Sequence, residues 1–260
     1  MGGGTPTSLE GYQLSKILNV VKENFDLSNL LELTVEAGRP DSITREKLEA
    51  LKEVGVDRIS INPQTMQQKT LDLIGRHHTI EDIFESYKLA RDVGFENINM
   101  DFIIGLNGET LEDVIDSFKK VRTFTPESVT IHSLALKRAA RLNTENKREI
   151  MDNDLILSMI NTATDTCADL GLEPYYLYRQ KNMAGNLENI GFSKPGKECL
   201  YNILIMEEKQ TIIACGAGTS SKIVFGDGRI ERIENVKDPK LYIERLDEMI
   251  MRKESMHGID

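Results

Sequence analysis

The sequence predicts an α/β fold in which a parallel sheet forms a partly open barrel, followed by a smaller α+β region. Strand and helix patterns alternate through the first half of the chain, which is typical of right-handed βαβ units. One unit repeats: residues 53–61 are echoed by residues 92–100, and in each copy a helix pattern ends at a glycine before a short β pattern begins. One strand is also polar at alternate positions, which favours a barrel lumen that holds a polar ligand.

The elements follow from helix caps and hydrophobic periodicity. Thr44, Thr79 and Thr110 are expected N-caps of three helices, and an aspartate three positions later strengthens the second and third caps. Between the helices we predict strands over residues 31–37, 58–62, 97–104 and 128–134. Later elements are a long helix over 147–170 ended by Gly171, a β-rich region over 201–236 and a closing helix over 238–253. We predict a division into a partial barrel, residues 1–142, and a helical and β-rich region over the barrel mouth, residues 143–260.

The strand over residues 97–104 has two different faces. Asn97, Asn99 and Asp101 alternate with apolar residues. Parallel strands normally bury both faces in apolar contacts, so a polar inner face indicates a lumen with a polar ligand. A half-exposed edge strand is the alternative interpretation.

Composition restricts the partners. The chain has 260 residues and a formal net charge of −10, which disfavours general attraction to nucleic acid or anionic lipid. No apolar run approaches the ~20 residues that a membrane span needs, and residues 1–4 lack the basic and apolar regions of a signal peptide. Three scattered cysteines favour a reducing compartment. We therefore expect a cytoplasmic protein with no nucleic-acid partner and no membrane span.

Candidate binding residues follow the predicted strands. Three consecutive glycines at residues 2–4 let a backbone approach a ligand closely. Glu36 ends the first strand, Gln64 follows the second and Asp101 lies in the third, at the edge where α/β proteins bind ligands. A carboxylate such as Glu36 can accept paired hydrogen bonds from ribose hydroxyls. For each residue alone, a loop-capping role is the alternative.

Five motifs together resemble one known family. They are Gly-Gly-Gly-Thr-Pro-Thr-Ser-Leu from residue 2, Thr-Val-Glu-Ala-Gly-Arg-Pro from 34, Arg-Ile-Ser-Ile-Asn-Pro-Gln-Thr-Met from 58, Ile-Gly-Arg-His-His-Thr from 74 and Asn-Met-Asp-Phe-Ile-Ile-Gly-Leu from 99. In this order they resemble the oxygen-independent coproporphyrinogen III dehydrogenase group of radical S-adenosylmethionine (SAM) enzymes, which includes a haem-chaperone branch. Residues 175–183, 194–198 and 215–218 are most similar to its HemZ-type branch.

The resemblance implies an incomplete parallel (β/α)6 radical-SAM-type (TIM-like) barrel. It also implies S-adenosyl-L-methionine as cofactor, with the glycine segment at its methionine end, Glu36 on the ribose and Ala135 on the adenine side. The implied cofactor contacts are Gly3, Gly4, Thr5, Glu36, Gln64, Arg76, Asp101, Ala135 and Ser220.

The resemblance further implies an activity and its partners. The complete enzyme would convert coproporphyrinogen III to protoporphyrinogen IX by oxidative decarboxylation, with an electron donor such as flavodoxin or ferredoxin. Two alternatives stay open: a haem-binding chaperone of the same family, and a SAM-binding fragment without activity. No catalytic residue is assigned.

The iron–sulfur ligands of the family have no counterpart here. Family members hold a [4Fe–4S] cluster with a Cys-x₃-Cys-x₂-Cys loop upstream of the glycine segment, which here begins at residue 2. Cys167, Cys199 and Cys215 are too far apart to replace that loop, and we expect them to be packing residues. The chain thus resembles a family member that begins after its cluster loop, with no metal ligands of its own. The adjacent pair His77 and His78 is expected to be structural.

Basic residues could bind the propionate carboxylates of a porphyrinogen or haem. The first group, Lys137, Arg138 and Arg141, follows the last barrel strand. The second group, Arg179 and Lys181, follows the tyrosine-rich segment over residues 175–178. A solvated helix start is the alternative for the first group. The candidates are Arg138, Arg141, Arg179 and Lys181.

Overall fold

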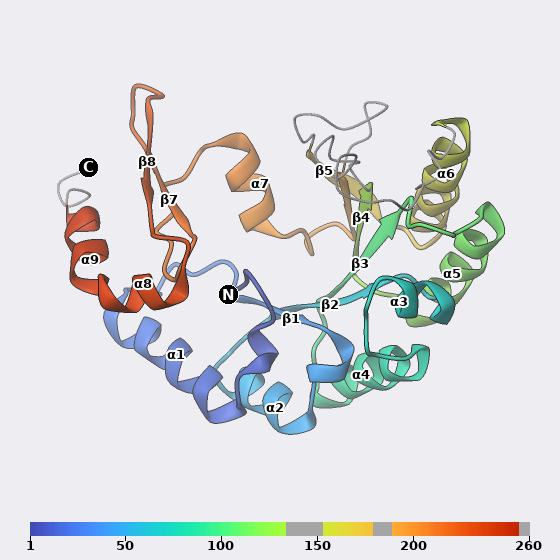
Figure 1. Ribbon diagram of the computed structural model, residues 1–260, viewed down its shortest axis with the longest axis horizontal. Helices are drawn as coiled ribbons and strands as arrows, with labels where there is room; N and C mark the ends of the chain where they lie inside the picture. The colour runs from blue at the N-terminus through green and yellow to red at the C-terminus, as the bar shows by residue number, and fades with distance from the viewer. Residues whose placement is uncertain (134–152, 179–188, 255–260) are drawn as a thin grey trace. The chain divides into compact units, whose positions relative to one another are not determined.

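The computed structural model describes residues 1–133, 153–178 and 189–254 (Figure 1). The chain forms two compact units, Met1–Cys199 and Leu200–Asp260. The division predicted between residues 142 and 143 lies inside the first unit, because two strands and a helix after residue 150 pack with the barrel elements.

The first unit is built on a six-stranded sheet with the order β1-β2-β3-β4-β6-β5. The first four strands are parallel, whereas β6 runs antiparallel to both β4 and β5. The predicted α/β fold with a mostly parallel sheet is confirmed. The strand bounds are Thr34–Gly38 for β1, Arg58–Gln64 for β2, Ile98–Ile104 for β3, Ser128–Ser133 for β4, Glu173–Tyr178 for β5 and Asn189–Ser193 for β6.

Helices follow one face of this sheet (Figure 1). Apolar side chains of the strands pack under them; the rings of Phe102 on β3 and Phe118 on α5, for example, have centroids 5.2 Å apart. The helix bounds are Gly11–Asn24 for α1, Arg45–Glu53 for α2, Gln68–Leu73 for α3, Ile80–Val93 for α4, Leu111–Phe124 for α5 and Asn153–Asp169 for α6. Two 3-10 turns also lie in this unit, η1 over Pro6–Ser8 and η2 over Pro40–Ser42.

The predicted caps are present. Thr79 and Thr110 form capping boxes with Asp82 and Asp113, and the Thr44 side chain accepts a hydrogen bond from the amide of the third helical residue. Each box satisfies two backbone amides that the first helical turn leaves without partners. The three threonines therefore mark where α2, α4 and α5 begin. Helices α1 and α3 were not predicted.

The strand over residues 97–104 is not an edge strand. Strand β3 lies between β2 and β4, and Asn99 on its polar face is only 3% exposed. The edge interpretation is wrong, and the polar residues of β3 face other polar groups instead of bulk solvent.

The described residues of the second unit, 200–254, form an antiparallel hairpin and three helices. Strands β7 (Ser220–Val224) and β8 (Ile230–Glu234) pair with each other, and α8 (Pro239–Glu244) is separated from α9 (Leu246–Glu254) by Arg245. The closing helix predicted over 238–253 is thus two helices. Residues 201–207, expected to be part of a β-rich region, lie in helix α7 (Leu200–Glu207), because a short apolar run rich in Leu, Ile and Met forms a helix as readily as a strand.

Within residues 1–133, 153–178 and 189–254, no helix is both long enough and apolar enough to cross a bilayer.

Candidate functional site

The glycine segment lies against the carboxyl end of β1. Met1 pairs with this strand: its amino group donates to the Thr34 carbonyl (2.6 Å) and its carbonyl accepts from the Glu36 amide (2.9 Å). The Gly3 amide then donates to Glu36 Oε2 at 3.3 Å. A Cβ atom on Gly2 would lie 2.6 Å from the Glu36 carboxylate. The predicted close approach of backbone and carboxylate is therefore present, and a side chain at residue 2 would displace the acid.

Positive φ angles continue through the segment. Gly3 has a φ of 83° and Gly4 a φ of 136°, conformations that side chains rarely adopt. Thr5 follows, and its methyl group contacts Gly38, where an added Cβ would come within 3.3 Å. Thr7 then anchors the segment by donating to the carbonyl of Ala37. The loop over residues 2–5 is thus attached to β1 on both sides.

Gln64 and Arg76 come from the connection that follows β2. Gln64 ends the strand with a φ of 72° and is 7% exposed. Arg76 follows α3 and is half-buried, and within the described residues its guanidinium has no hydrogen-bond or ion-pair partner. Burial lowers the pKa of Arg76, and the nearby Arg39, itself paired with Asp41 at 2.6 Å, lowers it further. A half-buried guanidinium without a protein partner is suited to an anionic ligand.

Polar side chains form a row across the inner face of the sheet. Glu36, Ser60 and Asn99 are register partners on β1, β2 and β3. Asn99 Nδ2 donates to Ser60 Oγ (2.9 Å) and to Asp101 Oδ1 (2.6 Å), and Ser60 Oγ donates to Asn62 Oδ1 (2.9 Å). The carboxylate of Asp101 is thereby held by a buried amide, in line with the predicted polar lumen.

The row continues onto β4 and β5. Thr130 on β4 donates to Asn99 Oδ1 at 3.1 Å, and Tyr176 on β5 hydrogen-bonds with Thr130. Burial raises the pKa of the Tyr176 phenol, and the nearby Tyr175 and Asp101 raise it further. The ring of Tyr176 occupies the place of a side chain at Gly191 on β6. Ser60, Asn62, Thr130 and Tyr176 were missed from sequence, although Ser60 and Asn62 show the same polar alternation as β3.

The structure brings together only some of the predicted contacts. Glu36 meets the glycine segment directly, and Asp101 shares the polar row with it. Ser220 lies on β7 in the second unit and donates to Glu234 Oε1 at 2.7 Å, so its cofactor role stays a prediction. The remaining candidates lie outside the described residues: Ala135, Lys137, Arg138, Arg141, Arg179 and Lys181.

The cysteines and histidines lie apart from one another. Cys167 is fully buried in α6, as predicted, and burial raises the pKa of its thiol to about 12. Cys199 is buried as well, but Cys215 is exposed in a loop, so the packing role expected for it is wrong. His78 is buried with Nε2 3.2 Å from the Pro63 carbonyl, a structural contact. In the described part of the chain, no group of three or more His, Cys, Asp or Glu side chains could hold a metal ion.

These features fit the methionine and ribose ends of S-adenosylmethionine. The glycine segment offers backbone groups beside the Glu36 carboxylate, and the Gly2 position has no room for a side chain. A carboxylate beside bare backbone can bind adjacent hydroxyls while amides and carbonyls contact a polar chain.

Comparison with known proteins identifies a domain and several relatives. Residues 1–121 match the model of the radical SAM superfamily. The chain is 47% identical over 249 residues to the oxygen-independent coproporphyrinogen-III oxidase-like protein HemZ of Bacillus subtilis, covering 95% of this chain and 50% of that protein. It is 31% identical over 223 residues to the haem chaperone HemW of Lactococcus lactis, covering 85% and 55%.

A solved structure agrees with the fold. The coproporphyrinogen III oxidase HemN of Escherichia coli, described as a radical SAM enzyme, matches with a TM-score of 0.74 at 22% identity, over 95% of this chain and 56% of that one. The chain spans about half the length of the curated relatives it matches. Together with the motifs, these matches show a radical SAM domain in residues 1–121 and confirm the resemblance of the chain to the coproporphyrinogen III oxidase and haem-chaperone group.

Proposed function

We propose that this chain forms the SAM-binding part of a radical enzyme that acts on a porphyrinogen in haem biosynthesis. The proposed reaction is the oxidative decarboxylation of coproporphyrinogen III to protoporphyrinogen IX, in the cytoplasm. The observation that carries the proposal is the contact of the glycine segment with Glu36, which continues into the polar row toward Asp101. S-adenosylmethionine, with electrons from a [4Fe–4S] cluster, supplies hydrogen-abstracting chemistry when bound.

The chain's own residues bind and orient the cofactor in this proposal. Gly3 and Gly4 present backbone groups to the methionine end, and Glu36 accepts hydrogen bonds from the ribose hydroxyls. Arg76 meets an anionic group, since its guanidinium is half-buried and has no partner among the described residues. Asp101 contacts the cofactor with a carboxylate that Asn99 holds in place at 2.6 Å. Gln64, Thr5, Ala135 and Ser220 complete the proposed contacts.

The substrate assignment rests on charge and on the relatives. A porphyrinogen with propionate side chains needs cationic partners, and the proposed ones are Arg138, Arg141, Arg179 and Lys181. The electron donor proposed for the cluster is a flavodoxin or ferredoxin.

Anaerobic turnover by a chimera tests this function. In the chimera, this chain replaces the matching 249 residues of the Bacillus subtilis HemZ-type relative. With S-adenosylmethionine, coproporphyrinogen III and a reductant, we expect vinyl-bearing product, detected as protoporphyrin fluorescence after oxidation. Asp101→Asn should reduce turnover about 10²-fold or more because it removes a charged cofactor contact. Cluster-loaded chimera that binds S-adenosylmethionine but forms no product would contradict the substrate assignment.

A second function is favoured by the likeness to HemW proteins. In this alternative proposal the same fold binds haem and transfers it without turnover; those relatives are named haem chaperones. Haem titration followed by absorbance separates the two: stoichiometric, tight binding without coproporphyrinogen turnover would favour the chaperone.

A further inference from the structure

Gln64 has a backbone conformation that its residue type disfavours. Its φ of 72° lies in the left-handed region, where a long side chain crowds its own backbone. The register between β2 and β3 also shifts between Ile61 and Gln64. Such conformations persist where the surrounding structure determines them, and they are concentrated at functional sites.

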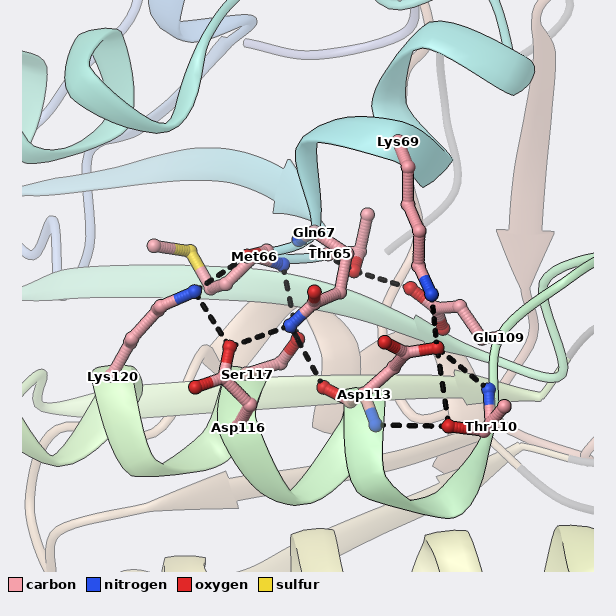
Figure 2. A network of polar contacts seen from close by, with 10 residues as sticks. All are labelled: Thr65, Met66, Gln67, Lys69, Glu109, Thr110, Asp113, Asp116, Ser117 and Lys120. Carbon is pink, nitrogen blue, oxygen red and sulfur yellow. Dashed lines mark hydrogen bonds and ion pairs between the residues drawn. The ribbon is translucent and has the colours of Figure 1, made fainter.

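The next three residues are tied to α5 and to the loop before it (Figure 2). The Met66 amide donates to Ser117 Oγ (3.3 Å), and its carbonyl accepts from Lys120 Nζ (3.1 Å). Gln67 Nε2 donates to the Asp113 carbonyl at 3.0 Å and also contacts two side chains of α5. The segment after Gln64 therefore has little freedom to turn.

Glu109 is the buried member of this network. It is 5% exposed and lies in the loop that joins β3 to α5. Thr65 donates its hydroxyl to Glu109 Oε1, and the same hydroxyl accepts from the Gln67 amide at 3.2 Å. Figure 2 shows the Thr65 and Glu109 side chains pointing toward each other from the two loops. Burial raises the pKa of Glu109, while hydrogen bonds from Thr65 and Thr70 lower it.

Two strand ends are joined by this one carboxyl group. Gln64 ends β2, and the loop after β3, the strand of Asp101, carries Glu109. The capping box of Thr110 and Asp113 fixes the position of Glu109 relative to α5. The Gln64 carboxamide has no hydrogen-bond partner among the described residues, so it is available to a ligand.

We propose that Glu109, acting through Thr65, is a positioning residue that holds Gln64 in its left-handed conformation and so presents its carboxamide to the cofactor. This inference rests on the proposed SAM site. A carboxamide that is fixed before binding loses less conformational freedom when the ligand arrives, which increases affinity. Glu109 acts here as a hydrogen-bond acceptor, a role that a glutamine carbonyl can also fill.

Calorimetric titration of the chain with S-adenosylmethionine tests the proposal. We expect Glu109→Ala to weaken binding about tenfold and Glu109→Gln to stay within about twofold of the wild type. Thr65→Val, which removes the hydroxyl and keeps the side-chain shape, is the milder second variant. It should weaken binding of S-adenosylmethionine as Glu109→Ala does. The control is Arg122→Ala on α5. The ion pair of Arg122 with Asp169 lies outside the network, so the affinity of this variant for S-adenosylmethionine should be unchanged.

A double-mutant cycle separates positioning from a general structural role. Glycine adopts positive φ without strain, and Gln64→Gly also removes the carboxamide. In that background, Glu109→Ala should weaken binding no further. Equal losses in both backgrounds, or a Glu109→Gln variant as weak as Glu109→Ala, would overturn the positioning role. Wild-type affinity in Glu109→Ala and Thr65→Val, with weakened binding in Glu36→Ala, would overturn this inference alone. A wild-type chain that binds no S-adenosylmethionine would overturn both it and the proposed site.

Discussion

Glu127 is predicted to be a main stabilising residue at the amino-terminal edge of the sheet. It directly precedes β4 and is 9% exposed. Its carboxylate accepts from Arg91 Nη2 (2.7 Å), Lys194 Nζ (3.2 Å) and the buried amide of Ile98 (3.1 Å). One side chain thus joins segments from α4, β3, β4 and the end of β6.

The cost of Glu127→Ala follows from these contacts. The Ile98 amide loses its partner in a buried place, which costs about 1–3 kcal/mol. Arg91 and Lys194 are 28% and 39% exposed, so water can replace part of what they lose, and each pair is worth only about 0–1 kcal/mol. We therefore expect the free energy of unfolding to fall by about 1–5 kcal/mol.

Urea unfolding followed by circular dichroism measures this change through the linear dependence of stability on denaturant. The matched control is Asp169→Ala, which removes an ion pair with Arg122 whose side chains are 43% and 60% exposed. The control should cost at most about 1 kcal/mol. A loss below about 1 kcal/mol for Glu127→Ala, or one equal to the control, would refute the reasoning from burial.

Three further predictions concern other parts of the first unit and the free thiols. Gly191→Ala should lower the free energy of unfolding by about 1–3 kcal/mol, because the new methyl group would overlap the Tyr176 ring. In urea unfolding, adding Tyr176→Ala to this variant should recover part of the lost stability. Burial lowers the pKa of His78, so the unfolded chain takes up a proton below pH ~6.5 while the folded chain does not. Stability should therefore fall as the pH drops from 6.5 toward the folded pKa, and unfolding curves of His78→Gln should lack this component. A thiol reagent should label the exposed Cys215 in the native protein and reach Cys167 only after unfolding; equal labelling rates would contradict the burial of α6.

Local signals in the sequence predicted the parallel part of the fold. Thr79 and Thr110 identify helix starts because their side chains satisfy specific backbone amides, a property that does not depend on distant contacts. Strand β6 was not predicted, and an alternating pattern would not have shown its direction, since it reads the same for parallel and antiparallel pairing. Helix α7 was misassigned because short apolar runs do not distinguish helix from strand.

The candidate site also contains residues whose placement the sequence predicted and residues whose placement it did not. Glu36 and Asp101 could be predicted because parallel strands bring their carboxyl ends to one edge, whereas Arg76 was indicated only by the family resemblance. The left-handed conformation of Gln64 and its support by Glu109 could not be predicted. Thr65 and Glu109 are 44 residues apart, and their contact exists only after β2 and β3 have paired.

The measurement that tests the central claim most directly is titration of the chain with S-adenosylmethionine, wild type against Glu36→Ala, by calorimetry. A matched control is Glu49→Ala, which removes an exposed carboxylate on α2. We predict one binding site in the wild type and in the control, and a loss of roughly 1–3 kcal/mol of binding free energy in Glu36→Ala, from one pair of hydrogen bonds. Absence of binding in the wild type, or equal affinity in Glu36→Ala, would contradict the account of the site.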